Sequence, residues 1–346
     1  MTLTGRGTPN GITTRTTIRD VAEQAGVSVA TVSKVLNNRY GVSAATQERV
    51  QQVIDSLGYE ASLVARSLRN QRTNVIGILV ADLEPFSTEL LKGASRAIHG
   101  RGYELLVYSA GGLTQDHVGW ERRYLSRLAG TLIDGAILVT PTVVDTPSEV
   151  PYVAVDPHTG RPGPPTVDSD NLNGARLAVE HLISLGHRRI GMIAGRADLE
   201  SARLREEGYR LALETNDIEV VPDLIKLGGY DPELAEVASR QLLDRDDRPT
   251  AIFAANDLMA LETLAVAKEL GIRVPEDLSL VGFDNVPDSV MAEPSLTTIN
   301  QPIQEMGRLS IEILLQLMAG EEPDELHVTL PTQLVVRQST GPATRR

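Results

Sequence analysis

Residues 17–38 read TIRDVAEQAGVSVATVSKVLNN, the pattern of two short helices joined by a tight turn. Apolar side chains recur at helical spacing on both sides of this turn, at Ile18, Val21, Ala22, Ala25, Val32, Val35 and Leu36. A further set that predicts a third helix follows at Val50, Val53, Ile54 and Leu57. We expect these helices to form a small unit that is separate from the larger fold after it.

The ends of these helices carry residues that start and stop a helix. Thr17 and Ser28 are suited to cap the first and second helices, and Asp20 lies in the first turn, where the helix dipole favours an acidic group. Gly26 supplies the positive φ that the turn needs. The sequence therefore predicts a helix-turn-helix whose second helix presents its N-terminal part to base edges of DNA. The alternative is a helical unit without affinity for DNA.

The side chains expected at DNA either cap a helix or face away from the apolar set. They are Thr17, Ser28, Val29, Ala30, Thr31, Ser33, Lys34 and Asn37. The distribution of charge agrees with this expectation. Residues 1–74 hold nine Lys/Arg against five Asp/Glu, a net charge of +4, whereas the remaining 24 Lys/Arg against 41 Asp/Glu give −17.

Composition excludes several classes of protein. With no cysteine in 346 residues, disulfides and thiolate sites are excluded, and six histidines without a His-x-x-x-His pair favour no metal site. The chain lacks both an apolar run of the roughly 20 residues that span a membrane and a signal peptide, so we expect a reducing cytoplasm. It also lacks Gly-x-Ser-x-Gly, His-Glu-x-x-His, Walker and Gly-x-Gly-x-x-Gly motifs, so we expect neither an enzyme nor a cofactor.

The rest of the chain alternates short apolar runs with stretches of helical spacing. The runs are VIGILV (75–80), ELLVYS (104–109), GAILVT (135–140), YVAVD (152–156), RIGMIAG (189–195), AIFAAND (251–257) and LSLVGFD (278–284). This alternation predicts parallel sheets built from βαβ units, in two doubly wound α/β subdomains. The expected organisation is a disordered tail at 1–16, the helical head at 17–61, a linker at 62–73 and the body at 74–346.

Polar residues gather where the predicted strands of the body end. Asp82, Asp156, Asn256 and Asp284 follow four of the apolar runs, and Arg203 opens the segment SARLREEGY. Parallel sheets bind ligands at the carboxyl ends of their strands, and carboxylates with an arginine suit sugar hydroxyls. The alternative for such residues is a helix cap, the role that we prefer for Asp170 and leave open for Asp257. We expect Trp120, His181 and His187 to be structural.

Several long motifs resemble the lactose-repressor (LacI/GalR) family, whose head reads D-V-A-x-x-A-G-V-S-x-x-T-V-S-R-V-L-N. The later matches are ARSLR (65–69), VEHLISLGHRRIG (179–191), SARLREEGY (201–209), FAANDLMA (253–260), VPEDLSLVGFDN (274–285) and LTTINQP (296–302). The sequence departs from the family at Lys34, where an arginine is usual, and at Ala61-Ser62, where Pro-Asn is usual. Both departures leave the preferred operator sequence open.

The resemblance implies a role for the linker. In the family the stretch that matches 62–70 becomes a helix on the operator, and paired helices of a dimer insert a leucine into the minor groove. Leu68 matches that leucine, Ala65 allows close approach, and Arg66 and Arg69 lie near phosphates. The alternative is that Leu68 packs against the body.

The resemblance also implies a body of the periplasmic-binding-protein type, with a small molecule held between its subdomains. Tyr230 aligns with a position whose ring stacks on a sugar. The effector-binding residues expected are Asp82, Phe86, Asp156, Arg203, Tyr230, Asn256, Asp284 and Gln301. We expect a homodimeric repressor that a sugar releases from a pseudo-palindromic operator. The alternatives are a purine-responsive or activating regulator, a sugar-transport protein and, less favoured, a sugar-acting enzyme.

Overall fold

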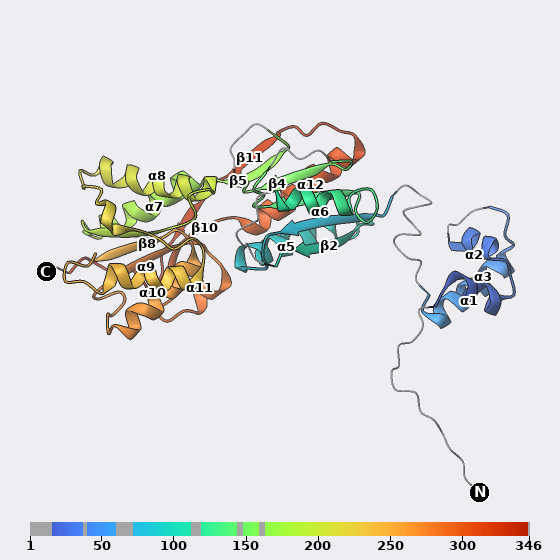
Figure 1. Ribbon diagram of the computed structural model, residues 1–346, viewed down its shortest axis with the longest axis horizontal. Helices are drawn as coiled ribbons and strands as arrows, with labels where there is room; N and C mark the ends of the chain where they lie inside the picture. The colour runs from blue at the N-terminus through green and yellow to red at the C-terminus, as the bar shows by residue number, and fades with distance from the viewer. Residues whose placement is uncertain are drawn as a thin grey trace, which may run out of the picture. The chain divides into compact units, whose positions relative to one another are not determined.

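The computed structural model describes residues 16–36, 40–59, 72–111, 119–143, 148–158 and 163–344 (Figure 1). The chain divides into two compact units, residues 1–71 and 72–346, which we call the head and the body. The predicted tail at 1–16, apart from Thr16, and residues 62–71 of the predicted linker lie outside the described residues.

The head contains three helices, α1 (Ile18–Ala25), α2 (Val29–Leu36) and α3 (Ala44–Leu57). Thr17 and Asp20 form a capping box at the start of α1, and Gly26 ends that helix with a φ of 63°. The hydrogen bonds from Thr17 lower the pKa of Asp20. The core of the head is made by Val21, Ala22, Ala25, Val32, Val35, Val50 and Ile54. The predicted helix-turn-helix is confirmed.

The body contains two six-stranded sheets. The first has the strand order β11-β5-β4-β3-β1-β2 and is parallel throughout, and the second has the order β12-β10-β9-β8-β6-β7, antiparallel only between β10 and β12. The strands of the first sheet are β1 (Val75–Val80), β2 (Glu104–Ser109), β3 (Gly135–Val139), β4 (Tyr152–Val155), β5 (Thr166–Ser169) and β11 (His327–Leu330). Those of the second are β6 (Ile190–Ala194), β7 (Ile225–Leu227), β8 (Ala251–Ala254), β9 (Ser279–Asp284), β10 (Thr297–Asn300) and β12 (Gln333–Val335).

Each sheet forms a subdomain with its own helices (Figure 1). The first subdomain has α5 (Pro85–Ile98), α6 (Trp120–Leu128) and α12 (Ile303–Ala319). The second has α7 (Asn171–Ser184), α8 (Glu200–Thr215), the 3₁₀ turn η1 (Pro222–Leu224), α9 (Pro232–Leu243), α10 (Asp257–Glu269) and α11 (Pro287–Met291). The predicted pair of parallel-sheet α/β subdomains is therefore confirmed.

Helices α5 and α12 approach each other at two glycines. A Cβ atom on Gly93 would lie 1.8 Å from the backbone oxygen of Gln304, and one on Gly307 would lie 2.2 Å from the backbone oxygen of Leu90. The two backbones are thus in direct contact, which places α12 firmly on the first subdomain although it follows the second in sequence.

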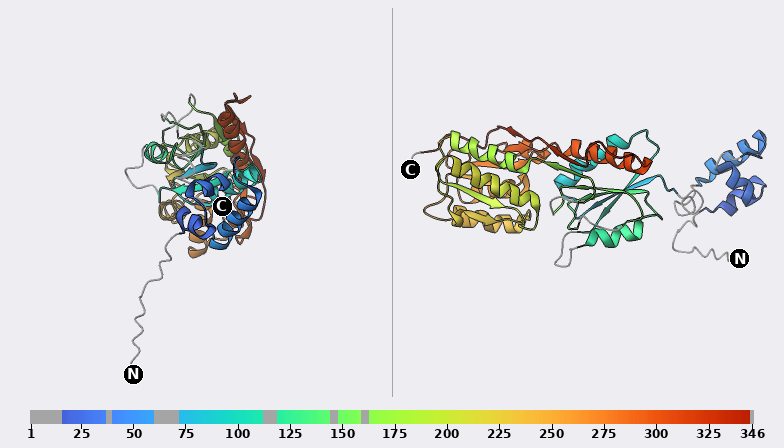
Figure 2. Two further views of the ribbon diagram at one scale, coloured as in Figure 1. Left: turned by 90° about the vertical axis from the view of Figure 1, so that its right-hand side faces the viewer. Right: turned by 90° about the horizontal axis from the view of Figure 1, so that it is seen from above.

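The chain passes between the subdomains three times (Figures 1 and 2). The crossings connect β5 to α7, β10 to α12 and β11 to β12. We call residues 169–171, 300–302 and 331–332 the hinge. The strands that the sequence reading did not pick out, β5, β7, β10, β11 and β12, are short or partly polar, so they lack the apolar run by which the others were found.

Candidate functional site

Helix α2 presents the side chains that were expected to face away from the head core. Val29, Ala30 and Lys34 are exposed, and Thr31 and Ser33 are half-buried. The Ser28 hydroxyl accepts a hydrogen bond from the Thr31 backbone N–H at 3.1 Å, so it caps this helix. The exposed N-terminal face of α2 is geometrically suited to a DNA groove.

Five of the expected DNA contacts cannot be placed, because Asn37, Ala65, Arg66, Leu68 and Arg69 lie outside the described residues. The structure adds one candidate that sequence reasoning missed. The side chain of Tyr40 is fully exposed in the connection between α2 and α3. An aromatic residue in a mostly polar connection was the available signal, and tyrosine hydroxyls are common phosphate contacts.

The centre of the body holds a buried guanidinium, that of Arg205 on α8. Its Nε donates to Asn171 Oδ1 at 2.8 Å and its Nη1 donates to the backbone oxygen of Ala255 at 2.6 Å. Its Cζ lies 3.8 Å from the centre of the Phe283 ring, a cation–π contact. Nη1 also lies 3.5 Å from Asp284 Oδ1. Contacts on several sides fix this group in one orientation.

The arginine predicted for this site was Arg203, and the structure places Arg205 there instead. The side chain of Arg203 is 60% exposed and pairs with Glu200 one turn earlier. Residues two apart lie on different sides of a helix, so only one arginine of SARLR can face inward. Ser201 is buried and lies four residues before Arg205, on the same side of the helix, which indicates that Arg205 faces inward.

Asp284 connects this arginine to the hinge. Gln301 Nε2 donates to Asp284 Oδ1 at 2.7 Å, and Gln301 Oε1 accepts a hydrogen bond from the Ser169 hydroxyl. Burial raises the pKa of Asp284 to about 7, although the Arg205 charge acts in the opposite direction. Asp284 has a φ of 108°, a strained conformation that is common at functional sites. Gln301, expected at the effector, thus also joins two segments of the hinge.

Asp156 and Tyr230 approach Arg205 from the two subdomains. Burial raises the pKa of Asp156, opposed by the Arg205 charge and a hydrogen bond from Ser201. The Tyr230 ring occupies the space beside Gly195, where a Cβ atom would lie 2.3 Å from its Cζ. Its hydroxyl is buried near Ser201 but makes no hydrogen bond of normal geometry, and burial raises the pKa of Tyr230 to about 12. An unsatisfied buried hydroxyl is a group that a ligand can satisfy.

Asn256 and Asp257 lie at the start of α10. Asn256 Oδ1 accepts from the backbone N–H of Met259 at 3.0 Å, which makes Asn256 the helix cap. Asp257 accepts from the Thr298 hydroxyl at 2.5 Å and from the backbone N–H of Val286 at 2.9 Å. These bonds give Asp257 a structural role, and burial raises its pKa well above the usual value. Asp170 caps α7, as expected.

The connection between β1 and α5 differs from the sequence prediction. Asp82 is exposed and accepts from the backbone N–H of Leu83 at 2.7 Å, whereas Phe86 is buried. The inward-facing carboxylate is that of Glu84, which caps α5 and whose charge raises the pKa of Asp284. Burial in turn raises the pKa of Glu84. The signal was Glu84 directly before Pro85, since proline favours the first position of a helix.

The carboxylates of Asp156 and Asp284 thus act on one guanidinium, that of Arg205. They come from the two subdomains, and burial raises the pKa of each. Such an arrangement repels anions such as phosphates and offers acceptors to hydroxyl groups. The described residues include no group of three or more metal-ligating side chains.

A contact between the subdomains lies beside this cluster. His158, in the segment after β4, has its Nδ1 3.4 Å from Asp198 Oδ2, in the segment after β6. Asp198 is held by Arg196, whose Nη2 lies 2.6 Å from the same oxygen. A contact of this kind favours the closed arrangement of the two subdomains.

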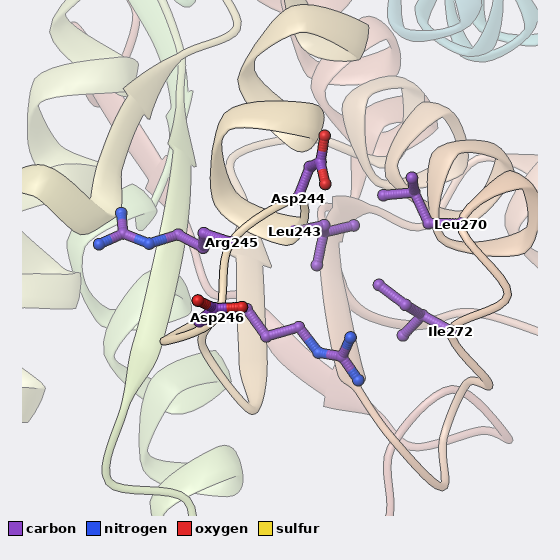
Figure 3. Close-up of a pocket in the computed structure, with 7 residues that line it drawn as sticks. Leu243, Asp244, Arg245, Asp246, Leu270 and Ile272 are labelled. Atoms are coloured by element: carbon purple, nitrogen blue, oxygen red, sulfur yellow. The ribbon is translucent and has the colours of Figure 1, made fainter.

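A pocket of about 420 Å³ lies at the edge of the second sheet that is opposite the Arg205 cluster. Figure 3 shows Leu243 and Asp244 across this pocket from Leu270 and Ile272. It lies near the ends of α9 and α10 and thus near the amino ends of β8 and β9, where open α/β sheets do not bind their ligands. The Arg205 cluster, by contrast, includes Asp156 and Asp284, which lie at the carboxyl ends of β4 and β9.

The residues expected to be structural are buried or bonded within the body. Trp120 is 2% exposed. His187 bonds Thr250 and Ser279, and His181 bonds Thr340. In the described part of the chain, no helix has the length and apolar character needed to cross a membrane.

Comparison with known proteins gives matches to both units. Residues 17–62 match the bacterial regulatory proteins of the lacI family, and residues 179–340 match the periplasmic binding protein-like domain. The HTH-type transcriptional repressor PurR of Aliivibrio salmonicida is 33% identical over 331 residues, which cover 93% of this chain and 98% of the relative.

Two solved structures extend over nearly the whole chain. The transcriptional regulator CelR–cellobiose complex is 35% identical, with a TM-score of 0.70, over 94% of this chain and 100% of its own. The lac repressor dimer bound to operator and the anti-inducer ONPF is 30% identical, with a TM-score of 0.78, over 95% of this chain and 100% of its own.

Proposed function

Because this chain belongs to the LacI family of bacterial regulatory proteins, we propose that it is a homodimeric repressor released from a pseudo-palindromic operator by a sugar. Family membership itself makes the chain a DNA-binding transcriptional regulator and not an enzyme. The direction of regulation, the dimer and the effector belong to the proposal.

The head supports the DNA part of the proposal. The N-terminal face of α2 enters the major groove, where Lys34 reads a base edge and Ser28 contacts the backbone. A lysine makes a single-point contact where the fork of an arginine makes two, so the base preference at this position is weaker. Ala65, Arg66, Leu68 and Arg69 act in the minor groove.

The Arg205 cluster carries the effector part of the proposal. The carboxylates of Asp156 and Asp284 and the Arg205 guanidinium, together with the unsatisfied hydroxyl of Tyr230, match a neutral ligand rich in hydroxyl groups. The similarity to the CelR–cellobiose complex supports a sugar. A purine is the competing effector.

Release follows from the position of the cluster between the subdomains. A ligand that replaces the Arg205–Asp284 contact also changes the bonds that Asp284 makes through Gln301 to the hinge. The effector can release the operator only through its different affinity for the two subdomain arrangements, typically about 1–3 kcal/mol of coupling.

The test is an operator titration followed by fluorescence anisotropy, with and without sugars and purines. We expect Arg205→Lys to bind operator normally and to stay bound when effector is added. Arg203→Ala, on the same helix but exposed, is the matched control and should respond as the unmodified chain does. If Arg205→Lys leaves the operator at the same effector concentration as the unmodified chain, the proposed effector site is refuted.

The same titration tests the head through its salt dependence. Operator affinity should fall by roughly 0.9 log unit per log unit of salt for each phosphate contact. Absence of operator binding by the full chain at low salt would refute the repressor proposal regardless of the effector.

A further inference from the structure

A pocket of about 390 Å³ lies between the subdomains, beside the Arg205 cluster. Its walls come from β5 and β11 of the first subdomain and from the first turns of α7 and α8 of the second. Its volume falls within the range of roughly 300–1,000 Å³ that is usual for ligand pockets.

The first-subdomain wall is formed by two neighbouring strands. Asp168 on β5 and Thr329 on β11 are partners in the parallel register, so their side chains lie next to each other. They alternate with Val167 and Val328, which pack into the core of this subdomain. Asp168 and Thr329 therefore project from the other face of the sheet, where they line the pocket.

The pocket shares a wall with the Arg205 cluster. Asp156, Asn171 and Ser201 line it and are all buried. Asn171 Oδ1 accepts the hydrogen bond from Arg205 Nε, and the Asp156 charge acts on Arg205. One extended ligand can thus contact the cluster and enter the pocket.

The lining residues define the chemistry of what the pocket can hold. Four carboxylates and no lysine or arginine line it, which disfavours phosphates and carboxylates and favours hydroxyl donors. Pro157, Leu172 and Leu204 add apolar surface, which suits the C–H face of a sugar ring. Carboxylate acceptors beside an apolar wall are the groups that a neutral pyranose or furanose requires.

We propose that this pocket holds the second sugar unit of an oligosaccharide effector whose first unit lies against Arg205 and Tyr230. The inference rests on the proposed sugar effector and narrows it to a chain of at least two units. The similarity to the CelR–cellobiose complex supports this choice, because cellobiose is a two-unit sugar.

The experiment is calorimetric titration of the full chain with cellobiose, xylobiose and maltose and with glucose and xylose. One disaccharide should bind at least about tenfold more tightly than its monosaccharide, because it adds hydrogen-bonded hydroxyls. Thr329→Trp should fill the pocket and remove this advantage while the monosaccharide affinity stays unchanged. Asp168→Asn should reduce it more mildly.

Glu325→Trp is the matched control, because Glu325 is exposed, lies just before β11 and does not line the pocket. Equal affinity for a monosaccharide and its disaccharide, or equal behaviour of Thr329→Trp and Glu325→Trp, would overturn the second-unit pocket and leave the sugar effector intact. If none of the five sugars binds while purines bind, the sugar effector itself is overturned.

Discussion

The head and the Arg205 cluster expose their polar groups in opposite ways. On α2, Lys34 is exposed and its partner can arrive from solvent, whereas Arg205, Asp284 and Gln301 are each less than a tenth exposed and already bonded to one another. A DNA ligand therefore adds contacts to an unchanged surface. An effector must exchange contacts within a network that reaches the hinge, which is how binding becomes a change of arrangement.

The largest expected effect tests whether head and body are stable independently. Gly93→Leu forces a side chain into the backbone of α12 and should destabilise the body by about 3 kcal/mol or more. The head should keep its own unfolding transition, since its core contains no body residue. Differential scanning calorimetry measures both transitions. Ser95→Leu, exposed on the same helix, is the control.

A single shared transition that Gly93→Leu lowers as a whole would show that the head depends on the body for its stability. The comparison between two separate units would then fail.

The second effect is the response of the two regions to pH. Burial raises the folded-state pKa of Asp284 to about 7 and also raises those of Asp156 and Glu84, so their contribution is fully present at low pH and is lost as pH rises towards 7. Asp20 in the head has a lowered pKa, so its contribution is lost as pH falls below about 4.

Urea unfolding at pH 5 and pH 8 checks the part of this contrast that concerns the body. Asp284→Asn should remove part of the stability difference between the two pH values. His181 and His187 act in the opposite direction, because burial lowers their pKa and their contribution is lost as pH falls below about 6.5. A pH dependence that Asp284→Asn leaves unchanged would mean that Asp284 is ionised throughout.

The two regions also differ in how much of them the sequence could predict. The head follows from local signals, because Thr17, Gly26 and Ser28 act on residues within one or two turns. The cluster depends on which side of a helix faces inward and on contacts across the hinge. Arg203 and Arg205 are indistinguishable by composition, and Glu84 was hidden by Asp82, which ends the strand more directly.

The third effect concerns the operator. Lys34→Ala should weaken operator binding by about 1–3 kcal/mol and relax the base preference at one position of each half-site. Effector affinity should stay the same, because Lys34 belongs to the other unit. Competition binding with operator variants measures this. Uniform weakening across all sequences would instead assign Lys34 to the phosphate backbone.

The smallest effect tests whether a partly exposed contact in the body contributes as little to stability as a contact on the exposed surface of the head. The His158–Asp198 contact joins the subdomains, but the Asp198 side chain is 53% exposed, so water screens the interaction. The contact itself should therefore contribute less than about 1 kcal/mol of stability. Because the contact is made between subdomains, its loss should favour the open arrangement and weaken effector binding a few-fold. Operator affinity in the absence of effector should change much less.

Calorimetric effector titration at low and high salt tests whether the contact acts through charge. The difference in effector affinity between His158→Ala and the unmodified chain should shrink at high salt. A salt-independent loss of more than about tenfold would mean that His158 acts on the ligand directly and that the buried cluster extends further than Arg205 and its partners.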